Sequence, residues 1–340
     1  MKIKDNLGKT SVSCMSLSYH TTEAEVDLGA LAYNYHQLRQ LAPLGVKFLA
    51  VVKADAYGHG AIPVSKRLEE LGADFLGVAT VKEGAELREG GIQKPILVLS
   101  GVYQEEVEAV LEYHLTPMLY RLEIAAALAA AASTRGKKVP VHIKVDTGMG
   151  RIGVLAEEAP DFMNRVRELE NLEIEGIASH FSTADEENSA FSAEQLERFS
   201  QTIEEMKRLN IDPPFCHIAN SAALVNLPAA HFTVVRPGIM LYGSYPSPSL
   251  KANVSLRRVM SWKGRVADLK KVPEGYPISY GRTFVTQRPS LIAAIPVGYA
   301  DGYNRLLSNR GEVLIKGKRV PVVGRVCMDW TMGDVTDIPG

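Results

Sequence analysis

The chain has 340 residues, and its 38 basic and 39 acidic side chains give a formal charge of −1. This near balance argues against a large basic surface, so we expect no nucleic-acid partner and no binding to anionic membranes. Hydrophobic residues make up 46% of the chain, which is ordinary for a globular protein. No apolar run approaches the roughly 18 residues that a membrane span requires.

The three cysteines are an odd number and lack the spacing of a zinc site. They indicate neither a disulfide framework nor a metal centre, so we expect a cytoplasmic protein with no bound metal. Residues 1–22 mix lysines with polar residues and lack the apolar segment of a secretory signal. We predict a disordered extension there. A start at Met15 would also fit, because periodic structure begins only near Glu23.

Between residues 23 and 245, short apolar runs rich in β-branched residues alternate with segments that have apolar residues at helical spacing. The predicted strands are Phe48–Val52, Phe75–Ala79, Ile96–Leu99, Thr116–Leu119, Val139–Val145, Ile174–Ser179, Phe215–Ala219 and Phe232–Val235. The predicted helices are Ile62–Leu71, Gln104–Tyr113, Arg121–Ala132, Ala156–Leu169 and Ala193–Leu209. About eight β/α repeats in roughly 200 residues predict a (β/α)8 barrel, or TIM barrel. A doubly wound open sheet is the alternative, because it also alternates strand and helix.

The pattern changes after about Gly243. Prolines become frequent and no long amphipathic helix follows. The strand-like stretches are Met260–Leu269, Ser290–Ile295, Val313–Ile315 and Arg319–Arg325. We therefore predict an α/β fold in which the barrel, residues 23–245, is followed by a mostly β C-terminal domain, residues 246–340.

Barrel enzymes carry their chemistry where the strands end. The first predicted strand ends at Lys53, and a glycine-containing segment follows as far as Gly60. Because a lysine at the end of a buried strand is partly desolvated, its pKa falls, which suits it to forming a Schiff base or abstracting a proton. The alternative is a structural lysine whose amine reaches solvent. The glycines favour the functional interpretation, since they let the loop pack tightly against a ligand.

Residues 148–153 match the G-x-G-x-x-G pattern of dinucleotide-binding proteins. That pattern also needs an acidic residue at the end of the next strand, where this sequence has His180, so a dinucleotide site is disfavoured. Arg151 instead indicates a cation at the mouth of a barrel. A lone histidine is commonly structural, but at the end of a barrel strand we interpret His180 as a cofactor contact.

Two loops late in the predicted barrel offer donors for an anion. Asn220 and Ser221 begin a helix after the seventh strand, and residues 238–239 follow the eighth. Either loop alone is compatible with ordinary capping, but barrels often bind phosphate with these two loops together. With Lys53, and with Arg236 at the end of the eighth strand, they predict a site for pyridoxal phosphate.

Seven segments, in order, resemble the motifs of bacterial alanine racemases, which are pyridoxal phosphate-dependent enzymes of fold type III. The segments are Val52–Gly60, Asp146–Arg151, His217–Ser221, Val235–Gly238, Ile278–Gly281, Val297–Gly302 and Gly324–Asp329. The resemblance runs from about Glu23 to the last residue. It implies an amino-acid racemase, an isomerase that interconverts L-alanine and D-alanine and supplies D-alanine for peptidoglycan.

The resemblance also implies roles for individual residues. Lys53 would hold the cofactor and act as a base on one face of the substrate Cα, and Tyr280, from the β domain, would be the base on the opposite face. Besides Lys53, the residues implied to bind the cofactor are Tyr57, Arg151, His180, Asn220, Ser221, Arg236, Gly238 and Ile239. Lys144 matches a lysine that is often carbamylated in the family.

Arg151 and Met328 are implied to bind the substrate carboxylate, and Tyr299 is implied to line the channel through which substrate enters. In the family the tyrosine base reaches the barrel of a second subunit, so the resemblance implies a homodimer with shared active sites. The family continues beyond the equivalent of Gly340, so we expect a β domain truncated at its C-terminus.

Three alternatives remain at this point. A truncated chain would be an inactive, cofactor-binding fragment, and a complete active site could instead serve a racemase of broader substrate range. A pyridoxal phosphate-dependent decarboxylase of a related fold would need a carboxylate at the position of Arg236.

Overall fold

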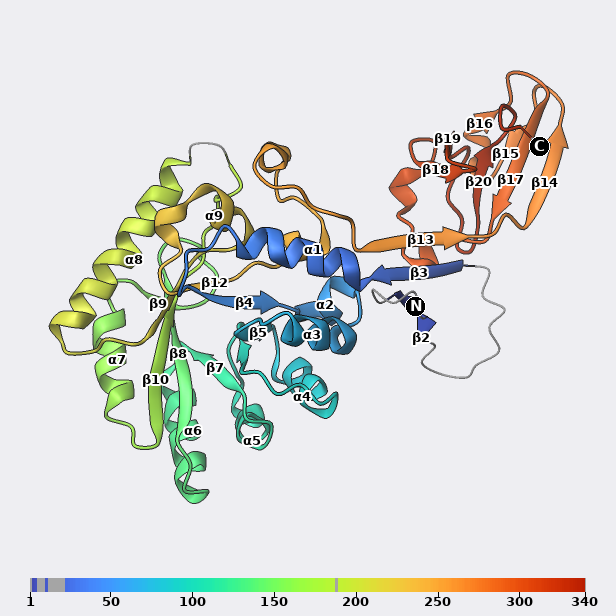
Figure 1. Ribbon diagram of the computed structural model, residues 1–340. Coiled ribbons are helices and arrows are strands. Elements are labelled where there is room, and N and C mark those ends of the chain that lie inside the picture. The colour runs from blue at the N-terminus through green and yellow to red at the C-terminus, as the bar shows by residue number, and fades with distance from the viewer. Residues whose placement is uncertain (1, 5–9, 12–21, 187–188, 340) are drawn as a thin grey trace. The chain divides into compact units, whose positions relative to one another are not determined.

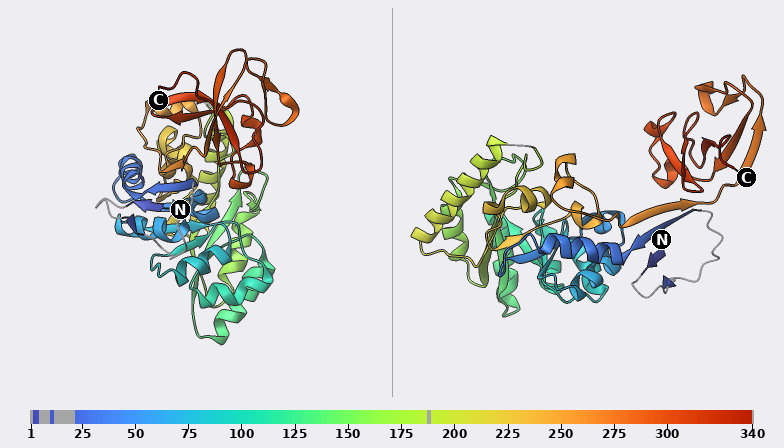
Figure 2. Two further views of the ribbon diagram at one scale, coloured as in Figure 1. Left: turned by 90° about the vertical axis from the view of Figure 1, so that its right-hand side faces the viewer. Right: turned by 45° about the horizontal axis from the view of Figure 1, so that its top comes forward.

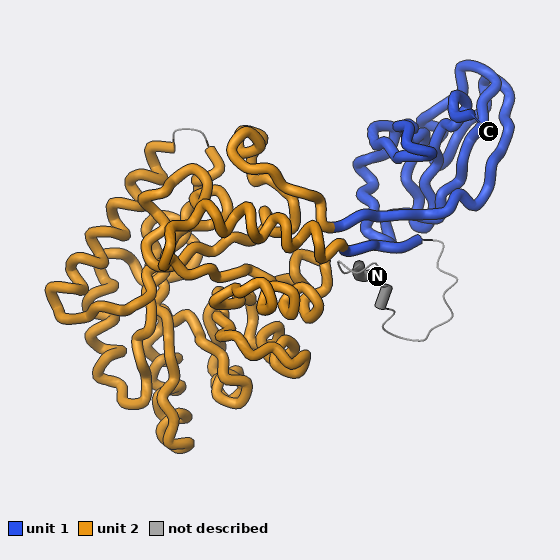
Figure 3. The backbone as a smooth tube through the Cα atoms, in the orientation of Figure 1, with its two compact units in different colours: residues 1–26, 260–340 blue, residues 27–259 orange. Residues whose placement is uncertain are grey.

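The computed structural model describes residues 2–4, 10–11, 22–186 and 189–339. It contains two compact units (Figure 3). The larger is Asp27–Val259, and the smaller joins residues 260–340 to those before residue 27. None of the helices in the described part of the chain is long and apolar enough to cross a membrane.

The larger unit is built on parallel strands in the order β11-β10-β8-β7-β6-β5-β4-β12. They are β4 (Lys47–Val51), β5 (Phe75–Val78), β6 (Ile96–Val98), β7 (Thr116–Leu119), β8 (Val139–Asp146), β10 (Leu172–Ala178), β11 (Phe215–His217) and β12 (Val234–Val235), and β9 (Val154–Leu155) pairs with β8. Between β11 and β12, the Thr233 amide donates to the Cys216 carbonyl at 3.2 Å. The result is a nearly closed eight-stranded barrel, which confirms the predicted fold class and excludes the doubly wound sheet.

Helices lie around the outside of these strands (Figures 1 and 2). They are α1 (Leu28–Arg39), α3 (Ala61–Glu70), α4 (Val81–Glu89), α5 (Val107–Glu112), α6 (Leu122–Thr134), α7 (Ala159–Arg167), α8 (Ala190–Arg208) and α9 (Ser221–Asn226). The short segment α2 (Lys53–Gly58) follows β4 directly and has a left-handed backbone. Short 3-10 turns are η1 (Gln104–Glu106), η2 (Pro228–Ala230), η3 (Ile239–Tyr242) and η4 (Pro248–Ala252). Neither α1 nor α4 is among the helices predicted from the sequence, although Thr80 and Glu83 form a capping box at the start of α4.

The core of the barrel explains why its strands are apolar throughout. All four residues of β5 are buried, as are those of β7. Inward-facing side chains of six strands form one apolar cluster: Leu49, Val51, Phe75, Leu97, Met118, Ala178 and Val234. Because this cluster fills the interior, polar side chains gather at the strand ends and at a few buried positions.

The smaller unit consists of antiparallel strands, as predicted for the C-terminal domain. Its strands are β3 (Thr22–Asp27) with β13 (Met260–Gly264), β14 (Asp268–Val272) with β17 (Ser290–Ile295) and β20 (Thr331–Asp334), β15 (Pro277–Ile278) with β16 (Phe284–Val285), and β18 (Glu312–Ile315) with β19 (Lys318–Pro321). The 3-10 turns are η5 (Tyr280–Arg282), η6 (Tyr299–Asp301) and η7 (Arg305–Leu307). The single strand predicted over residues 260–269 is two strands, β13 and β14, which pair with different neighbours.

The predicted N-terminal extension, residues 1–22, lies mostly outside the described residues. Within it the structure describes the short strands β1 (Lys2–Lys4) and β2 (Thr10–Ser11), which pair antiparallel, and Thr22, where β3 begins.

Candidate active site

A cavity of about 620 Å³ opens in the larger unit where the barrel strands end. It is lined by residues that directly follow β4, β6, β7, β10, β11 and β12. Of the residues predicted from the sequence, it brings together Lys53, Tyr57, Lys144, Arg151, His180, Asn220, Ser221, Arg236, Gly238 and Ile239.

The segment after Lys53 has an unusual backbone. Ala54, Asp55, Ala56 and Tyr57 all lie in the left-handed helical region, with φ between 52° and 55°. Each such residue with a side chain costs roughly 1–2 kcal/mol, and left-handed residues normally occur singly. A run of four after a strand therefore has to be held by other contacts, and strain of this kind is commonly stored at functional sites.

Two carboxylates hold this left-handed turn. Glu83 Oε1 accepts from the Ala54 amide at 2.7 Å, and Asp55 Oδ1 accepts from the Ala61 amide at 2.6 Å. The buried hydroxyl of Tyr242 also donates to the Val51 carbonyl at 2.9 Å, immediately before the turn. These hydrogen bonds fix the position of Lys53, which follows β4, at the edge of the cavity.

Tyr57, Ser221 and Gly238 converge on one side of the cavity. The Gly238 amide donates to Ser221 Oγ at 2.8 Å, and a Cβ added to Gly238 would lie 2.6 Å from the Tyr57 hydroxyl. Only glycine therefore leaves room for this arrangement. Asn220 caps α9 by accepting from the Ala223 amide at 3.0 Å, which fixes the start of the helix that carries Ser221. The cluster of hydroxyl and amide donors is suited to binding an anion.

Arg236 lies at the base of the cavity and is only 5% exposed. Its guanidinium donates to the Ser179 carbonyl at 2.7 Å, to His217 Nδ1 at 2.8 Å and to His180 Nδ1 at 3.1 Å. Because a guanidinium offers donors in a rigid plane and accepts nothing, these acceptors fix its orientation.

The cavity concentrates positive charge in a buried environment. Burial lowers the pKa of Lys53, and the nearby Arg151 lowers it further. Burial, then Arg236 and Arg151, holds the pKa of Lys144 well below its usual value, and burial and the surrounding cations do the same to His180. Such a site favours anionic ligands and an uncharged amine on its lysines.

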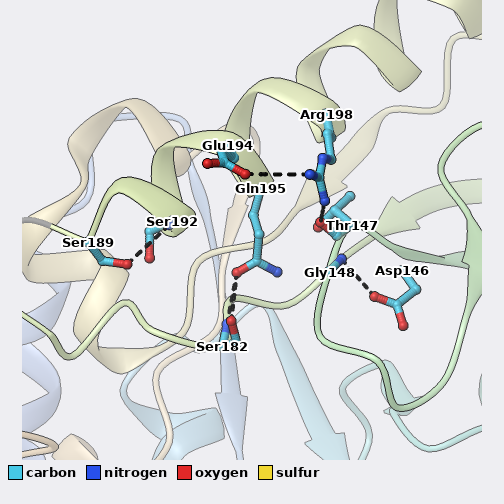
Figure 4. A network of polar contacts seen from close by, with 9 residues as sticks. All are labelled: Asp146, Thr147, Gly148, Ser182, Ser189, Ser192, Glu194, Gln195 and Arg198. Carbon is cyan, nitrogen blue, oxygen red and sulfur yellow. Dashed lines mark hydrogen bonds and ion pairs between the residues drawn. The ribbon is translucent and has the colours of Figure 1, made fainter.

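The loop that matched the dinucleotide pattern is held by its own carboxylate (Figure 4). Asp146 Oδ1 accepts from the Gly148 and Met149 amides at 2.8 Å each, and Arg198 donates to the Thr147 carbonyl at 3.2 Å. Burial raises the pKa of Asp146, but these amides outweigh it and lower the pKa overall. Since the anionic Asp146 bonds these amides and would repel a pyrophosphate, the loop instead serves to position Arg151 at the cavity.

The other predicted residues, Tyr280, Tyr299 and Met328, belong to the smaller unit and are 71%, 48% and 55% exposed. Tyr280 begins η5 and lines an apolar cavity of about 460 Å³ within that unit, together with Cys327 and Trp330. The Tyr299 amide donates to the Cys327 carbonyl and the Ala300 amide donates to the Met328 carbonyl, each at 3.0 Å, so the loops bearing Tyr299 and Met328 are connected.

Sequence reasoning missed several residues of the larger cavity, among them Ser100, Tyr103, Tyr120 and Asp185. Ser100 and Tyr120 follow β6 and β7 closely, so the rule that found Lys53 and His180 would have found them too. Among the described residues, no group of three or more histidine, cysteine, aspartate or glutamate side chains is arranged to hold a metal ion.

A barrel with a desolvated lysine, a buried arginine and an anion cradle at its strand ends is typical of an enzyme that uses an anionic cofactor. The family models of the alanine racemase N-terminal and C-terminal domains match residues 26–246 and 259–340. The chain therefore belongs to the alanine racemase family, as its resemblance to that family predicted, and is an enzyme of the isomerase class.

Individual relatives agree with this assignment. An alanine racemase from Halothermothrix orenii is 49% identical over 318 residues, which cover 94% of this chain and 84% of that protein. The solved structure of alanine racemase from Clostridium difficile 630 has a TM-score of 0.89 at 37% identity and covers 95% of this chain and 85% of its own. A structure from Bartonella henselae, described with covalently bound pyridoxal phosphate, has a TM-score of 0.82 at 30% identity and covers 94% of this chain and 88% of its own.

Proposed function

We propose that this protein interconverts L-alanine and D-alanine with bound pyridoxal 5′-phosphate. The observation that carries the proposal is the composition of the barrel cavity, where Lys53, Arg236 and the Tyr57–Ser221–Gly238 cluster line one space. The Bartonella relative with covalently bound pyridoxal phosphate supports the same cofactor here.

The residues present fit this cofactor. A phosphate ester needs several donors, and the hydroxyls of Tyr57 and Ser221 with the backbone at Gly238 and Ile239 supply them without a Cβ in the way. Lys53 would hold the cofactor through Nζ, and the donor-only guanidinium of Arg236 matches an unprotonated pyridine nitrogen. When bound, pyridoxal phosphate withdraws electrons from the substrate Cα and makes its proton more acidic.

Racemisation requires one base on each face of Cα. In our proposal Lys53 Nζ takes or returns the proton on one face, and the phenolic oxygen of Tyr280 does so on the other. The lowered pKa of Lys53, which burial and Arg151 produce, increases the fraction of its neutral, basic form at neutral pH. His180, which accepts from Arg236 at Nδ1, would help to polarise Tyr280.

Arg151, together with the backbone at Met328, would bind the substrate carboxylate, and Tyr299 would line the channel by which alanine enters. Lys144 is 6% exposed with its pKa held well below the usual range. A neutral amine is the form that adds to carbon dioxide and releases a proton to give a carbamate. We infer that Lys144 is carbamylated, so that an anion beside Arg151 replaces a neutral amine, and the mass of one bound carbon dioxide on this residue tests the inference.

The active site would be shared between the two subunits of a homodimer, with Tyr280 supplied by the partner of the chain that supplies Lys53. The exposure of Tyr280 and Met328 on the smaller unit supports this arrangement, since a catalytic base needs a desolvated setting. In a bacterial cytoplasm the product D-alanine would enter peptidoglycan.

The decisive experiment is incubation of the purified holoenzyme with L-alanine in deuterated water. We expect deuterium at Cα and D-alanine accumulating to an equal mixture of enantiomers. Parallel incubations with L-serine and L-lysine measure the substrate range, and release of carbon dioxide from any of them would identify a decarboxylase instead. Exchange without inversion, or no exchange although the cofactor is bound, would overturn the proposal.

A further inference from the structure

A line of buried polar side chains leads from Arg236 away from the cavity. Arg236 Nη1 lies 2.8 Å from His217 Nδ1, and His217 Nε2 lies 2.7 Å from His142 Nδ1. His142 Nε2 then faces Glu175 Oε2 at 3.5 Å. His142 and His217 are 1% and 0% exposed, whereas the Glu175 side chain is 28% exposed. The line therefore joins a buried guanidinium to a carboxylate in contact with solvent.

The direction of every bond in this line follows from Arg236. A guanidinium only donates, so His217 Nδ1 must accept and the proton of neutral His217 must be on Nε2. That proton is donated to His142 Nδ1, which leaves the His142 proton on Nε2, opposite Glu175. If His142 Nδ1 donated instead, neither nitrogen of His217 would carry a proton, and the ring would be an imidazolate.

Burial supports two neutral rings. It lowers the pKa of His142 and holds that of His217 well below its usual value, and the charge of Arg236 acts in the same direction on both. The Glu175 carboxylate raises the pKa of His142, but burial outweighs it and the net shift is downward. His142 Nε2 makes no hydrogen bond of normal length among the described residues, so Glu175 is the acceptor available to it. A buried N–H without an acceptor is energetically costly, so the Glu175 carboxylate stabilises the fold by accepting from His142 Nε2–H.

The backbone of β10 is built to allow this contact. The pairing of β10 with β8 shifts register between Ile174 and Gly176, so Glu175 is the bulged residue. A bulge turns one side chain away from the regular alternation of the strand. A Cβ on Gly176 would run into the His142 ring, so the glycine leaves the space in which that ring lies.

We propose that Glu175 is a positioning residue that ends a one-way hydrogen-bond relay from Arg236 through His217 and His142. By accepting from His142 Nε2, Glu175 selects one tautomer of each histidine, and these tautomers present Nδ1 of His217 as a lone pair to Arg236. Arg236 is thereby held in one orientation toward the ring nitrogen of the cofactor, a consequence that rests on the function proposed above.

Loss of the Glu175 carboxylate would disturb Arg236, although the two residues are not in contact. Without an acceptor at Nε2, His142 gains by moving its proton to Nδ1, which then meets the Nε2 proton of His217. The proton of His217 then moves to Nδ1, so that an N–H of His217 faces an N–H of Arg236 and the two donors cannot form a hydrogen bond. The guanidinium would lose its contact with His217 although no residue of the cavity had changed.

The first test reads the tautomers in the unaltered protein. The full chain with bound pyridoxal phosphate is labelled with ¹⁵N-histidine, and long-range ¹⁵N–¹H spectra at neutral pH distinguish Nδ1–H from Nε2–H in each ring. His142→Asn and His217→Asn assign the two signals. We expect both rings as Nε2–H tautomers. A proton on Nδ1 of either ring would overturn the relay, whatever the activity of the enzyme.

The second test removes and restores the acceptor. In Glu175→Ala we expect mixed tautomers at both histidines, and kcat for racemisation lower by about tenfold with KM changed less than about twofold, because orientation rather than substrate binding is lost. In Glu175→Gln the amide oxygen still accepts, so single Nε2–H tautomers and kcat within about twofold of the unaltered protein are expected. Glu173→Ala, at an exposed position two residues earlier on β10, is the matched control.

Unaltered tautomers and kcat in Glu175→Ala would refute the role of Glu175. If Glu175→Ala does not fold, the spectrum of the unaltered protein and the behaviour of Glu175→Gln still decide the question. A chain with the expected tautomers that does not racemise alanine would refute the proposed function and leave the direction of the relay standing.

Discussion

The two units carry their candidate functional residues in opposite ways. In the barrel, Lys144 and Arg236 are 6% and 5% exposed, and Arg236 is held by carbonyls and histidines of its own unit. In the β unit, Tyr280 and Met328 are 71% and 55% exposed. The barrel residues are thus held within their own unit, whereas the proposed functional residues of the β unit are exposed.

This contrast has an energetic consequence. Residues of the barrel cavity are coupled to the fold, so changing them alters stability and pKa values as well as chemistry. Exposed residues of the β unit contribute little to stability, so changing them should alter the catalytic activity without altering the free energy of unfolding.

The strongest test of the contrast asks whether the two parts of the site come from different chains. Lys53→Ala and Tyr280→Ala should each reduce alanine racemisation by about 10³-fold or more. If subunits exchange at random, half of the dimers are mixed and one of the two sites in each is intact, so the mixture should recover about a quarter of normal activity. Activity is measured after denaturation and joint refolding. The control refolds each variant alone, and no recovery in the mixture would place both bases on one chain.

The next largest effect is expected at Arg236. A carboxylate in Arg236→Glu would leave the Ser179 and Ile218 carbonyls without donors and put an unpaired charge into the core, at a cost of about 3–5 kcal/mol. It would also favour a proton on the pyridine nitrogen of the proposed cofactor, which Arg236 would otherwise leave unprotonated. We expect racemisation to fall by about 100-fold and pyruvate formation from alanine to rise, because a protonated ring withdraws electrons more strongly.

Urea unfolding and an assay for pyruvate measure the two effects of Arg236→Glu. Arg121→Glu, on a side chain that is 51% exposed, is the control for the charge change itself. An unchanged ratio of pyruvate to D-alanine in Arg236→Glu would contradict the role given to the guanidinium.

A smaller effect is expected where the barrel needs a glycine. The Cβ of Gly238→Ala would lie 2.6 Å from the Tyr57 hydroxyl and push the ring aside. We expect the dissociation constant of pyridoxal phosphate, titrated into the apoprotein, to rise by about tenfold, which corresponds to one lost hydrogen bond to a charged group. Gly264→Ala in the β unit meets nothing closer than 3.5 Å and is the control. An unchanged dissociation constant would remove Tyr57 and Gly238 from the cofactor site.

The residues predicted at the barrel rim line one cavity for a physical reason. Parallel strands end at the same rim, so Lys53, His180 and Arg236 could be brought together from their positions after apolar runs without any knowledge of side-chain contacts. The short β-branched strands and their order followed from the same alternation.

Other features depend on contacts that no local pattern encodes. The left-handed turn of Ala54–Tyr57 contradicts the preference of each of its residues and exists because Glu83 and Asp55 hold it. β3 pairs with β13, a strand more than 200 positions later in the chain. The residues around β3 therefore do not indicate that this strand belongs to the β unit. His142 lies inside an apolar strand, and only the bulge at Glu175 reveals its partner.

The pH dependence of stability probes the buried histidines of the barrel. Burial lowers the pKa of His142, His180 and His217 in the folded protein, so below about pH 6.5 the unfolded chain binds more protons than the folded one. Stability should therefore fall with decreasing pH, by up to about 1.4 kcal/mol per pH unit for each histidine. Urea unfolding of the apoprotein between pH 7.5 and 5 measures this slope. The slope of stability against pH should be smaller in His180→Asn than in the unaltered protein, whereas the exposed control His114→Gln should leave it unchanged. A stability that does not change with pH would contradict neutral histidines in the folded protein.

The smallest expected effect is on the free energy of unfolding, when one tyrosine hydroxyl is removed from each unit in turn. Tyr242 in the barrel is 4% exposed and donates to the Val51 carbonyl at 2.9 Å, so Tyr242→Phe should lower the free energy of unfolding by about 1–2 kcal/mol. Tyr280→Phe removes the same atom from a ring that is 71% exposed, so we expect a change below about 0.5 kcal/mol although racemisation is lost. Urea unfolding at low protein concentration measures both variants, because dilution separates the stability of the chain from that of a dimer. Equal losses of stability would mean that Tyr280 is already part of a packed structure in its own chain, and the contrast between the two units would then fail at the residue on which the two-base proposal depends.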